Sequence, residues 1–370
     1  MTITHRLSSV LAAAALAVAA AAPLAAQAVP GELLPTPKNP PTRQGTRGAN
    51  FLEIGVGARA NGMSGAIASI VTGPTSWYWN PAGAASTESF ELAMTRQNLY
   101  TDLDIAQNYF AAALPFLGGV IGVSFNSLNS GKIPRTTEDE PFGDPVVGKT
   151  FEWNSSAIGA GYARRLTDRL DVGVGLKFIN EGLTDAQISW TGIDLGTQFR
   201  TGIYGLILGA SLQNVGPSAR MEGSLIDRRV NTDQFSNQLT RVTFHTQDTE
   251  LPTLFRFSVG TDLYGAAGSL FGQGNGKNVL LADATFNDAI DTAPQGAFGF
   301  EYGFANTVFV RAGKRFYNDD RATGTRGLYG LSGGLGLRVP LASRALRFDY
   351  AYTSLGDLDN VQVFSFELGR

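Results

Sequence analysis

Hydrophobic residues alternate with small or polar residues along most of the chain from about residue 89 onward. In the stretch LFRFSVGTDLY, which begins at Leu254, Phe255 and Phe257 fall on one side while Arg256 and Ser258 fall on the other. The same period of two recurs in LDVGVGLKF, AFGFEYGF and LRFDYAY. Because successive side chains point to opposite faces of a β-strand, this alternation predicts strands rather than helices.

The alternating segments divide into about fourteen predicted strands, an even number such as closed bacterial barrels have. Their approximate first residues are Ser89, Ile105, Gly119, Phe151, Leu170, Ala186, Gly202, Thr253, Asn278, Gln295, Thr307, Leu328, Arg344 and Val361.

Two folds would use such strands differently. In a soluble β-sandwich the apolar faces form the core and the other faces meet water, whereas in a transmembrane barrel the apolar faces meet lipid and the others line the lumen. The strands are about 9 to 12 residues long, close to what a tilted strand needs to cross a bilayer. The second face is rich in Gly, Ser and Ala, and charged residues keep strictly to it. These features favour an all-β transmembrane antiparallel barrel, with charges that face the lumen at Asp171, Lys177, Arg256, Asp262, Glu301, Arg311, Arg347, Asp349 and Glu367.

The connections between strands are alternately long and short. Those after odd-numbered strands include NSLNSGKIPRTTEDEPFGDPVVGK, the segment 214–251 and FYNDDRATGTRG, whereas those after even-numbered strands include PFLG, FRT, GFAN and PLAS. Outer-membrane barrels have short periplasmic turns and longer outer loops. The rhythm therefore places both termini in the periplasm, although the connection 265–277 is longer than it predicts.

The composition limits the kinds of functional site that the chain can contain. Residues 1–28, MTITHRLSSVLAAAALAVAAAAPLAAQA, have the basic start, apolar centre and Ala-x-Ala end of a secretory signal peptide. The net charge is −3 and the basic residues are scattered, so no nucleic-acid partner is expected. The chain has no Cys, and after processing it keeps only His245. We therefore expect no zinc or other metal site, no cofactor and no enzyme of the Ser-His-Asp or Cys-His kind.

Two segments precede the predicted barrel, which we place at 89–370. Residues 29–50 are rich in Pro and polar residues and predict an extended arm. Residues 51–88 are neither strand nor linker, and because a barrel of this size is too wide for its own side chains to fill, we expect them to plug the lumen as a hatch. The residues expected to form its central turn are Trp77, Tyr78, Trp79, Asn80, Pro81, Ala82 and Gly83.

The turn has a local physical basis. Pro81 fixes its own φ angle and pushes Asn80 toward an extended conformation. The alternative is that Trp77 and Trp79 belong to an aromatic girdle at the membrane interface.

The stretch FLEIGVGARANGMSGAIAS followed by SWYWNPAGAAS resembles the N-terminal signature of the PorV/PorQ family of outer-membrane proteins, which is similar in architecture to the fatty acid transporter FadL. LGASLQNVGP, LPTLFRFSVG and VRAGKRF support the resemblance. It implies a fourteen-stranded barrel in the bacterial outer membrane, with Asn80, Pro81 and Ala82 in a hatch. The chain departs from the family pattern in its non-aromatic end, ELGR, and in the length of the segment 219–250.

The resemblance implies two functions. The favoured hypothesis is a shuttle or docking component of type IX secretion, whose partners would be translocon components or exported cargo proteins. The alternative is a FadL-like channel, whose partner would be a hydrophobic ligand. Outer-membrane lipid is an expected partner in both cases. An outer-membrane enzyme or a soluble sandwich is the remaining hypothesis, which detergent-independent solubility would support.

Overall fold

The structure is a computed structural model that describes residues 45–99, 105–136, 141–143, 149–231, 239–274, 276–317, 330–355 and 360–369. The predicted signal peptide and most of the predicted arm lie outside the described residues. Among those residues, no helix is both long and apolar enough to cross a membrane.

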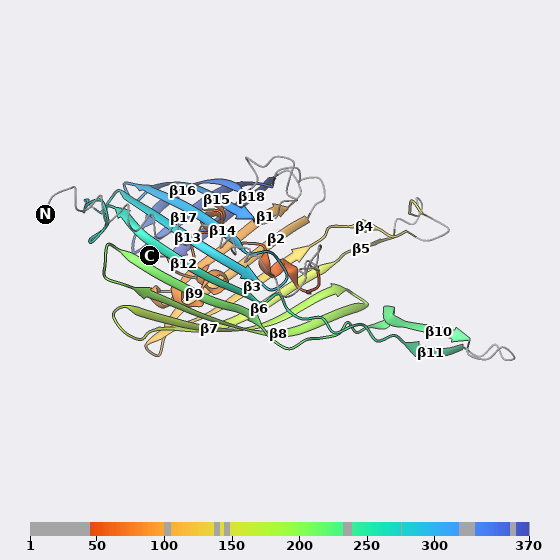
Figure 1. Ribbon diagram of the computed structural model, residues 1–370. Coiled ribbons are helices and arrows are strands. Elements are labelled where there is room, and N and C mark those ends of the chain that lie inside the picture. The colour runs from red at the N-terminus through yellow and green to blue at the C-terminus, as the bar shows by residue number, and fades with distance from the viewer. Residues whose placement is uncertain are drawn as a thin grey trace, which may run out of the picture. The chain divides into compact units, whose positions relative to one another are not determined.

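Fourteen strands form a closed antiparallel barrel in which β1 pairs with β18, as Figure 1 shows. They are β1 Glu91–Leu99, β2 Ile105–Phe116, β3 Gly119–Asn129, β6 Asn154–Arg165, β7 Leu170–Leu183, β8 Ala186–Arg200, β9 Leu206–Val215, β12 Leu254–Tyr264, β13 Val279–Ala289, β14 Gln295–Phe304, β15 Val308–Tyr317, β16 Leu331–Leu341, β17 Arg344–Ser354 and β18 Asn360–Gly369. The predicted fold class is confirmed, including the number of strands.

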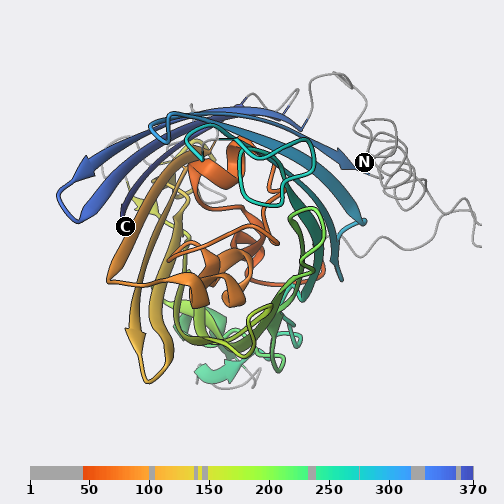
Figure 2. The same cartoon turned by 90° about the vertical axis from the view of Figure 1, so that its left-hand side faces the viewer.

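Four short helical segments precede β1. They are η1 Asn50–Glu53, α2 Ala58–Gly62, α3 Ser76–Trp79 and η2 Pro81–Ser86. Seen along the barrel in Figure 2, these orange segments lie inside the ring of strands. The expectation that a hatch occupies the lumen is therefore confirmed.

The long connections extend from the end of the barrel opposite the C-terminus (Figure 1). The connection after β3 carries the hairpin β4 Ile133–Pro134 with β5 Thr150–Phe151, and the connection after β9 carries η3 Ser224–Ile226 and the hairpin β10 Asp227–Asn231 with β11 Leu239–Thr243. We call this end the outer end and the other the periplasmic end, in keeping with the short turns there.

The long periplasmic connection 265–277 folds back on the strand before it. The backbone N–H of Leu270 donates to the carbonyl of Asp262 at 3.1 Å, and that of Phe271 donates to Leu263 at 2.8 Å. Its extra length therefore forms a flap against the end of β12 (teal in Figure 2).

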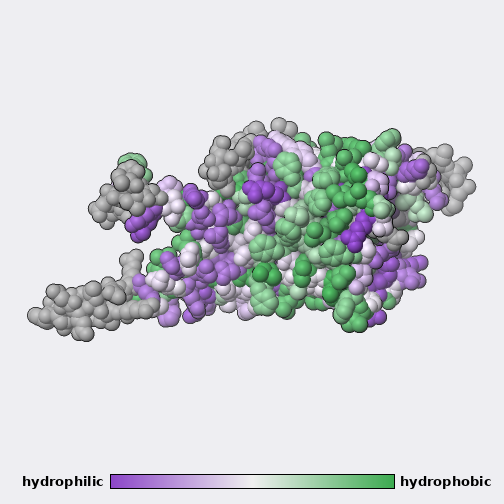
Figure 3. Space-filling view, turned by 180° about the vertical axis from the view of Figure 1, so that it is seen from behind, coloured by the Kyte–Doolittle hydropathy of each residue, from purple (hydrophilic) through white to green (hydrophobic). Residues whose placement is uncertain are grey.

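The outward faces of the strands form an apolar belt. Val123, Phe178, Phe300 and Phe364 are 57%, 60%, 50% and 51% exposed, although each belongs to a regular strand. Figure 3 shows the hydrophobic residues gathered in a band between two hydrophilic ends. Water-soluble monomers rarely expose apolar patches of more than a few hundred Å². The closed barrel and its belt therefore define an integral protein of the bacterial outer membrane.

Arg96 is an exception to the predicted distribution of charge. Met94, Arg96 and Asn98 are exposed on the outer face of β1, while Thr95 and Gln97 are buried on the inner face. The expectation that charges keep strictly to the lumen face is therefore wrong at this position. Polar residues occur on both faces of ELAMTRQNL, so the alternation in that strand does not identify its lipid-facing side.

Candidate functional site: the hatch and the lumen cavity

The hatch runs through the lumen from the outer end to the periplasmic end. At the outer end, the backbone N–H of Gly48 donates to the carbonyl of Glu250 at 3.0 Å, and that of Ala49 donates to the carboxylate of Glu181 at 2.6 Å. At the periplasmic end, η2 leads through Thr87 into β1. The segment between contributes most residues of the main buried hydrophobic cluster, including Met63, which is 0% exposed. The lumen thus contains an apolar core that the hatch and the inner wall form together.

Asn80 joins the hatch to the barrel wall. Its side chain is fully buried, and its amide Nδ2 donates to the carbonyl of Ala68 at 2.9 Å and to that of Thr197 on β8 at 2.9 Å. Its Oδ1 accepts from the backbone N–H of Ala82 at 3.2 Å and caps η2. The φ of Asn80 is −162°, so the residue is extended before Pro81 as the sequence predicts.

Each of the three aromatic residues before Asn80 donates a hydrogen bond from its polar atom inside the lumen. The indole N–H of Trp77 donates to Ala112 on β2 at 3.2 Å, and that of Trp79 donates to Val56 at 2.9 Å. The hydroxyl of Tyr78 donates to Leu52 at 2.9 Å. Because the two indoles are only 5% and 2% exposed, they take no part in an interfacial girdle.

Glycines of the inner wall let the hatch backbone approach closely. A Cβ atom on Gly196 would lie 2.2 Å from the Asn80 side chain, and one on Gly173 would lie 2.4 Å from the backbone of Pro81. A Cβ atom on Gly313 would lie 2.3 Å from Met63. The Gly-rich face in the sequence is therefore the surface that receives the hatch, and larger residues there would displace it.

One buried ion network ties α2 to the wall. The Arg59 guanidinium donates to both carboxylate oxygens of Glu301 on β14, at 3.0 and 2.9 Å. Glu301 also pairs with Arg311 at 2.5 Å and Arg347 at 3.2 Å. Asp349 completes the network by pairing with Arg311 at 2.8 Å and Arg347 at 3.0 Å. Four of the predicted lumen charges thus form a single cluster, to which Arg59 adds a fifth member that the sequence did not indicate.

The remaining predicted charges lie elsewhere on the inner face. Lys177 pairs with Asp194 at 2.6 Å, and the fully buried Asp171 pairs with Arg165 at 3.0 Å and Arg200 at 2.7 Å.

Arg256 contacts the hatch directly. Its guanidinium donates to the carbonyls of Tyr78 and Trp79, at 3.3 and 3.4 Å, and lies 4.8 Å from the centre of the Trp79 ring. Asp262 lies apart from these groups near the periplasmic end of β12, where it is partly exposed.

A cavity of about 340 Å³ lies between the hatch and strands β1, β12–β15, β17 and β18. Its apolar lining comes from Trp79, Ile54, Leu99, Leu254, Ala289, Leu355 and Val361, and its polar lining includes Glu53, Asn61, Gln97, Arg256 and Arg315. Arg315 is held by two hydrogen bonds to the carbonyl of Ser64, at 3.1 and 3.0 Å. No motif in the sequence predicts this cavity, because its walls come from segments more than 200 residues apart.

Glu53 is the acidic residue of the cavity whose pKa is shifted. Burial and, to a smaller extent, the neighbouring carboxylate of Asp291 raise the pKa of Glu53 to about 7, while Arg256 opposes the shift. Asp291 is 2% exposed and lies in the turn between β13 and β14. Burial also raises the pKa of Tyr78 to about 12, so its hydroxyl remains a donor at physiological pH. Among the described residues, no group of three or more acidic or His side chains has the arrangement of a metal site.

The fold and this interior define a class of protein, an outer-membrane barrel whose lumen is filled by an N-terminal hatch. The solved structures that the chain resembles include the toluene transporter TbuX of Ralstonia pickettii (11% identity, TM-score 0.50, 85% of this chain and 97% of that one), the toluene transporter TodX of Pseudomonas putida (11%, 0.50, 85% and 96%) and a FadL homologue of Pseudomonas aeruginosa (12%, 0.50, 84% and 97%). At these identities the likeness shows the fold. No family model and no curated protein matches the chain, so the resemblance to the PorV/PorQ family stays a prediction.

Proposed function

We propose that the protein is a channel that passes hydrophobic small molecules across the outer membrane, with the hatch as its gate. The observation that carries this proposal is the cavity of about 340 Å³ between hatch and wall, whose lining includes Trp79 and the aliphatic residues Ile54, Leu254 and Val361. An apolar cavity of about 150 Å³ is large enough to bind benzene. The cavity here therefore has room for one single-ring aromatic compound or a molecule somewhat larger.

The structures that resemble the chain support the same class of ligand. They include toluene transporters and a monoaromatic hydrocarbon channel. These proteins are channels rather than enzymes, and we infer the same of this chain. The ligand would enter at the outer end and wait beside Trp79. It would pass only when the contacts of Asn80 and Arg59 with the wall open.

Filling the cavity tests the proposal. Ala289 is 7% exposed and lines the cavity, so Ala289→Trp would occupy its space. The matched control is Ala160→Trp, because Ala160 lies on the exposed outer face of β6. Purified variants in liposomes would be assayed for uptake of labelled toluene and for quenching of tryptophan fluorescence. We expect A289W to lose uptake and A160W to keep it. Equal uptake by both variants would reject the cavity as the route.

A second candidate is the PorV-like secretion role, in which the protein docks translocon components or exported cargo. Its support is the outer end, where two hairpins project and where Phe142, Phe151 and Phe244 are 97%, 40% and 52% exposed. Co-purification of a secretion component from the native membrane, lost when residues 219–250 are deleted, would favour this role. A barrel that purifies alone while still taking up toluene would exclude it.

A further inference from the structure

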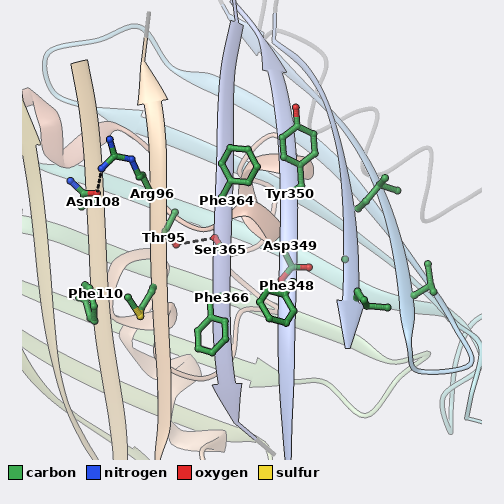
Figure 4. Close-up of a pocket in the computed structure, with 15 residues that line it drawn as sticks. Thr95, Arg96, Asn108, Phe110, Phe348, Asp349, Tyr350, Phe364, Ser365 and Phe366 are labelled. Atoms are coloured by element: carbon green, nitrogen blue, oxygen red, sulfur yellow. Dashed lines mark hydrogen bonds between the residues drawn. The ribbon is translucent and has the colours of Figure 1, made fainter. Parts of the chain in front are cut away.

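The lipid-facing surface has a groove of about 700 Å³ across β15–β18, β1 and β2. In Figure 4 the hatch lies behind these strands, so the labelled rings project on the side away from the lumen. Two ring pairs form one wall, with Phe348 and Phe366 5.3 Å apart and Tyr350 and Phe364 5.1 Å apart between ring centres. The other apolar lining residues are Met94, Phe110, Val308, Leu335 and Leu337. Such a lining suits an acyl chain.

One cation is present in the groove. The Arg96 guanidinium donates to the side-chain oxygen of Asn108 at 3.4 Å, as the dashed line in Figure 4 shows. Within the part of the chain that the structure describes, no carboxylate forms an ion pair with Arg96. Asn108 is neutral, so no described residue neutralises the positive charge of this side chain.

Arg96 lies where the apolar belt ends. Toward the periplasm, the next outward residue on β1 is Met94, which pairs with Phe366 on β18. Toward the outer end, the next is Asn98, which pairs with Gln362. The change from apolar to polar at this point places the guanidinium at the level of the outer-leaflet headgroups. A cation there avoids most of the cost of burial in hydrocarbon, because that cost falls steeply toward the interface.

We propose that this groove binds one anionic lipid of the outer leaflet, with its phosphate on Arg96 and an acyl chain along the paired aromatic rings. The apolar surface and the unneutralised cation match the two parts of such a molecule. The groove faces the bilayer, so lipid is what covers it. Basic sites at the membrane edge recognise anionic headgroups in this way. A free phosphate ion would satisfy only Arg96 and leave the groove unused.

The test uses the full protein in detergent micelles, with native mass spectrometry to count bound lipids. Phosphatidylglycerol is the anionic probe, phosphatidylcholine the neutral one and inorganic phosphate the competitor at constant ionic strength. The variants are Arg96→Gln, Arg96→Lys and Phe364→Ala. Arg164→Gln is the matched control, since Arg164 is exposed near the periplasmic end of β6.

We expect R96Q to weaken phosphatidylglycerol binding about fivefold, the effect of one basic residue at a membrane surface. R96K should keep most of the affinity, F364A should weaken binding of the same lipid, and R164Q should leave it unchanged. Equal binding by R96Q and the wild type would overturn the proposal. A loss in R164Q as large as in R96Q, or displacement of the lipid by inorganic phosphate alone, would overturn it as well.

Discussion

Replacing Asn80 by alanine would release the hatch from the wall without disturbing the strands. The change removes two donations from the side-chain amide, to Ala68 and to Thr197, and the acceptor that caps η2 at Ala82. The carbonyl of Ala68 keeps a second partner, because Gln198 donates to it at 3.3 Å. The main losses are therefore the hydrogen bond from the hatch to Thr197 and the cap of η2.

The magnitude follows from these contacts. Loss of a helix cap costs about 1 kcal/mol, and each of the two buried hydrogen bonds that the Asn80 amide makes, to Ala68 and to Thr197, contributes about 1 kcal/mol. The sum is about 3 kcal/mol, and it acts on docking of the hatch because the ladders of the barrel do not include the Asn80 side chain. The population of undocked hatch should therefore rise about a hundredfold.

The assay is permeability of reconstituted liposomes to a small sugar, together with the heat-resistant migration of the folded barrel on gels. Asn98→Ala is the matched control, since Asn98 is exposed on the outer face of β1. We expect N80A to leak, N98A to remain tight, and both barrels to stay folded. N80A liposomes as tight as the wild type would refute the reasoning, and so would loss of the folded barrel in N80A.

Two further predictions concern ionised groups. Glu301→Gln leaves three guanidiniums with one carboxylate in a buried network, so the free energy of unfolding of the barrel should fall by about 3–5 kcal/mol. The heat-resistant gel band of the folded barrel should therefore disappear at a lower temperature. Asp288→Asn, at an exposed position, should not change that temperature. The pKa of Glu53 is raised to about 7, so the protonated form stabilises the docked hatch at low pH and this contribution is lost as pH rises through about 7. Liposome permeability should therefore increase between about pH 4.5 and about pH 7 in the wild type but not in Glu53→Gln, and a pH response that persists in E53Q would contradict this assignment.

The strands were predictable because their signal is local. Ile105, Gly119, Leu170 and Ala186 were predicted as first residues and begin strands in the structure. The start predicted at Gly202 falls four residues before β9, which begins at Leu206. Ends such as this one are set by pairing with a neighbouring strand, and a single strand's composition does not contain that information.

The hatch was predictable as a segment but not as a set of contacts. Its length, its small residues and its position before β1 indicate a plug, and the backbone of Asn80 and Pro81 follows from proline chemistry. The pairing of Arg59 with Glu301 joins residues 242 positions apart, and no periodic pattern relates them. Arg96 departs from the general expectation that charges face the lumen for a related reason, since which side of β1 meets lipid depends on its partners β2 and β18.

The sequence by itself determined an antiparallel barrel of fourteen strands, its apolar belt and the presence of a hatch, because alternation along a strand directly encodes its two faces. Only the tertiary structure decided which glycines receive the hatch, which charges meet behind it, where a cavity remains beside Trp79 and where a cation faces the lipid. Those features depend on closure of the barrel. Closure surrounds the hatch with strands that are far from it in the sequence, and it brings their side chains to within hydrogen-bond distance of the hatch and of one another.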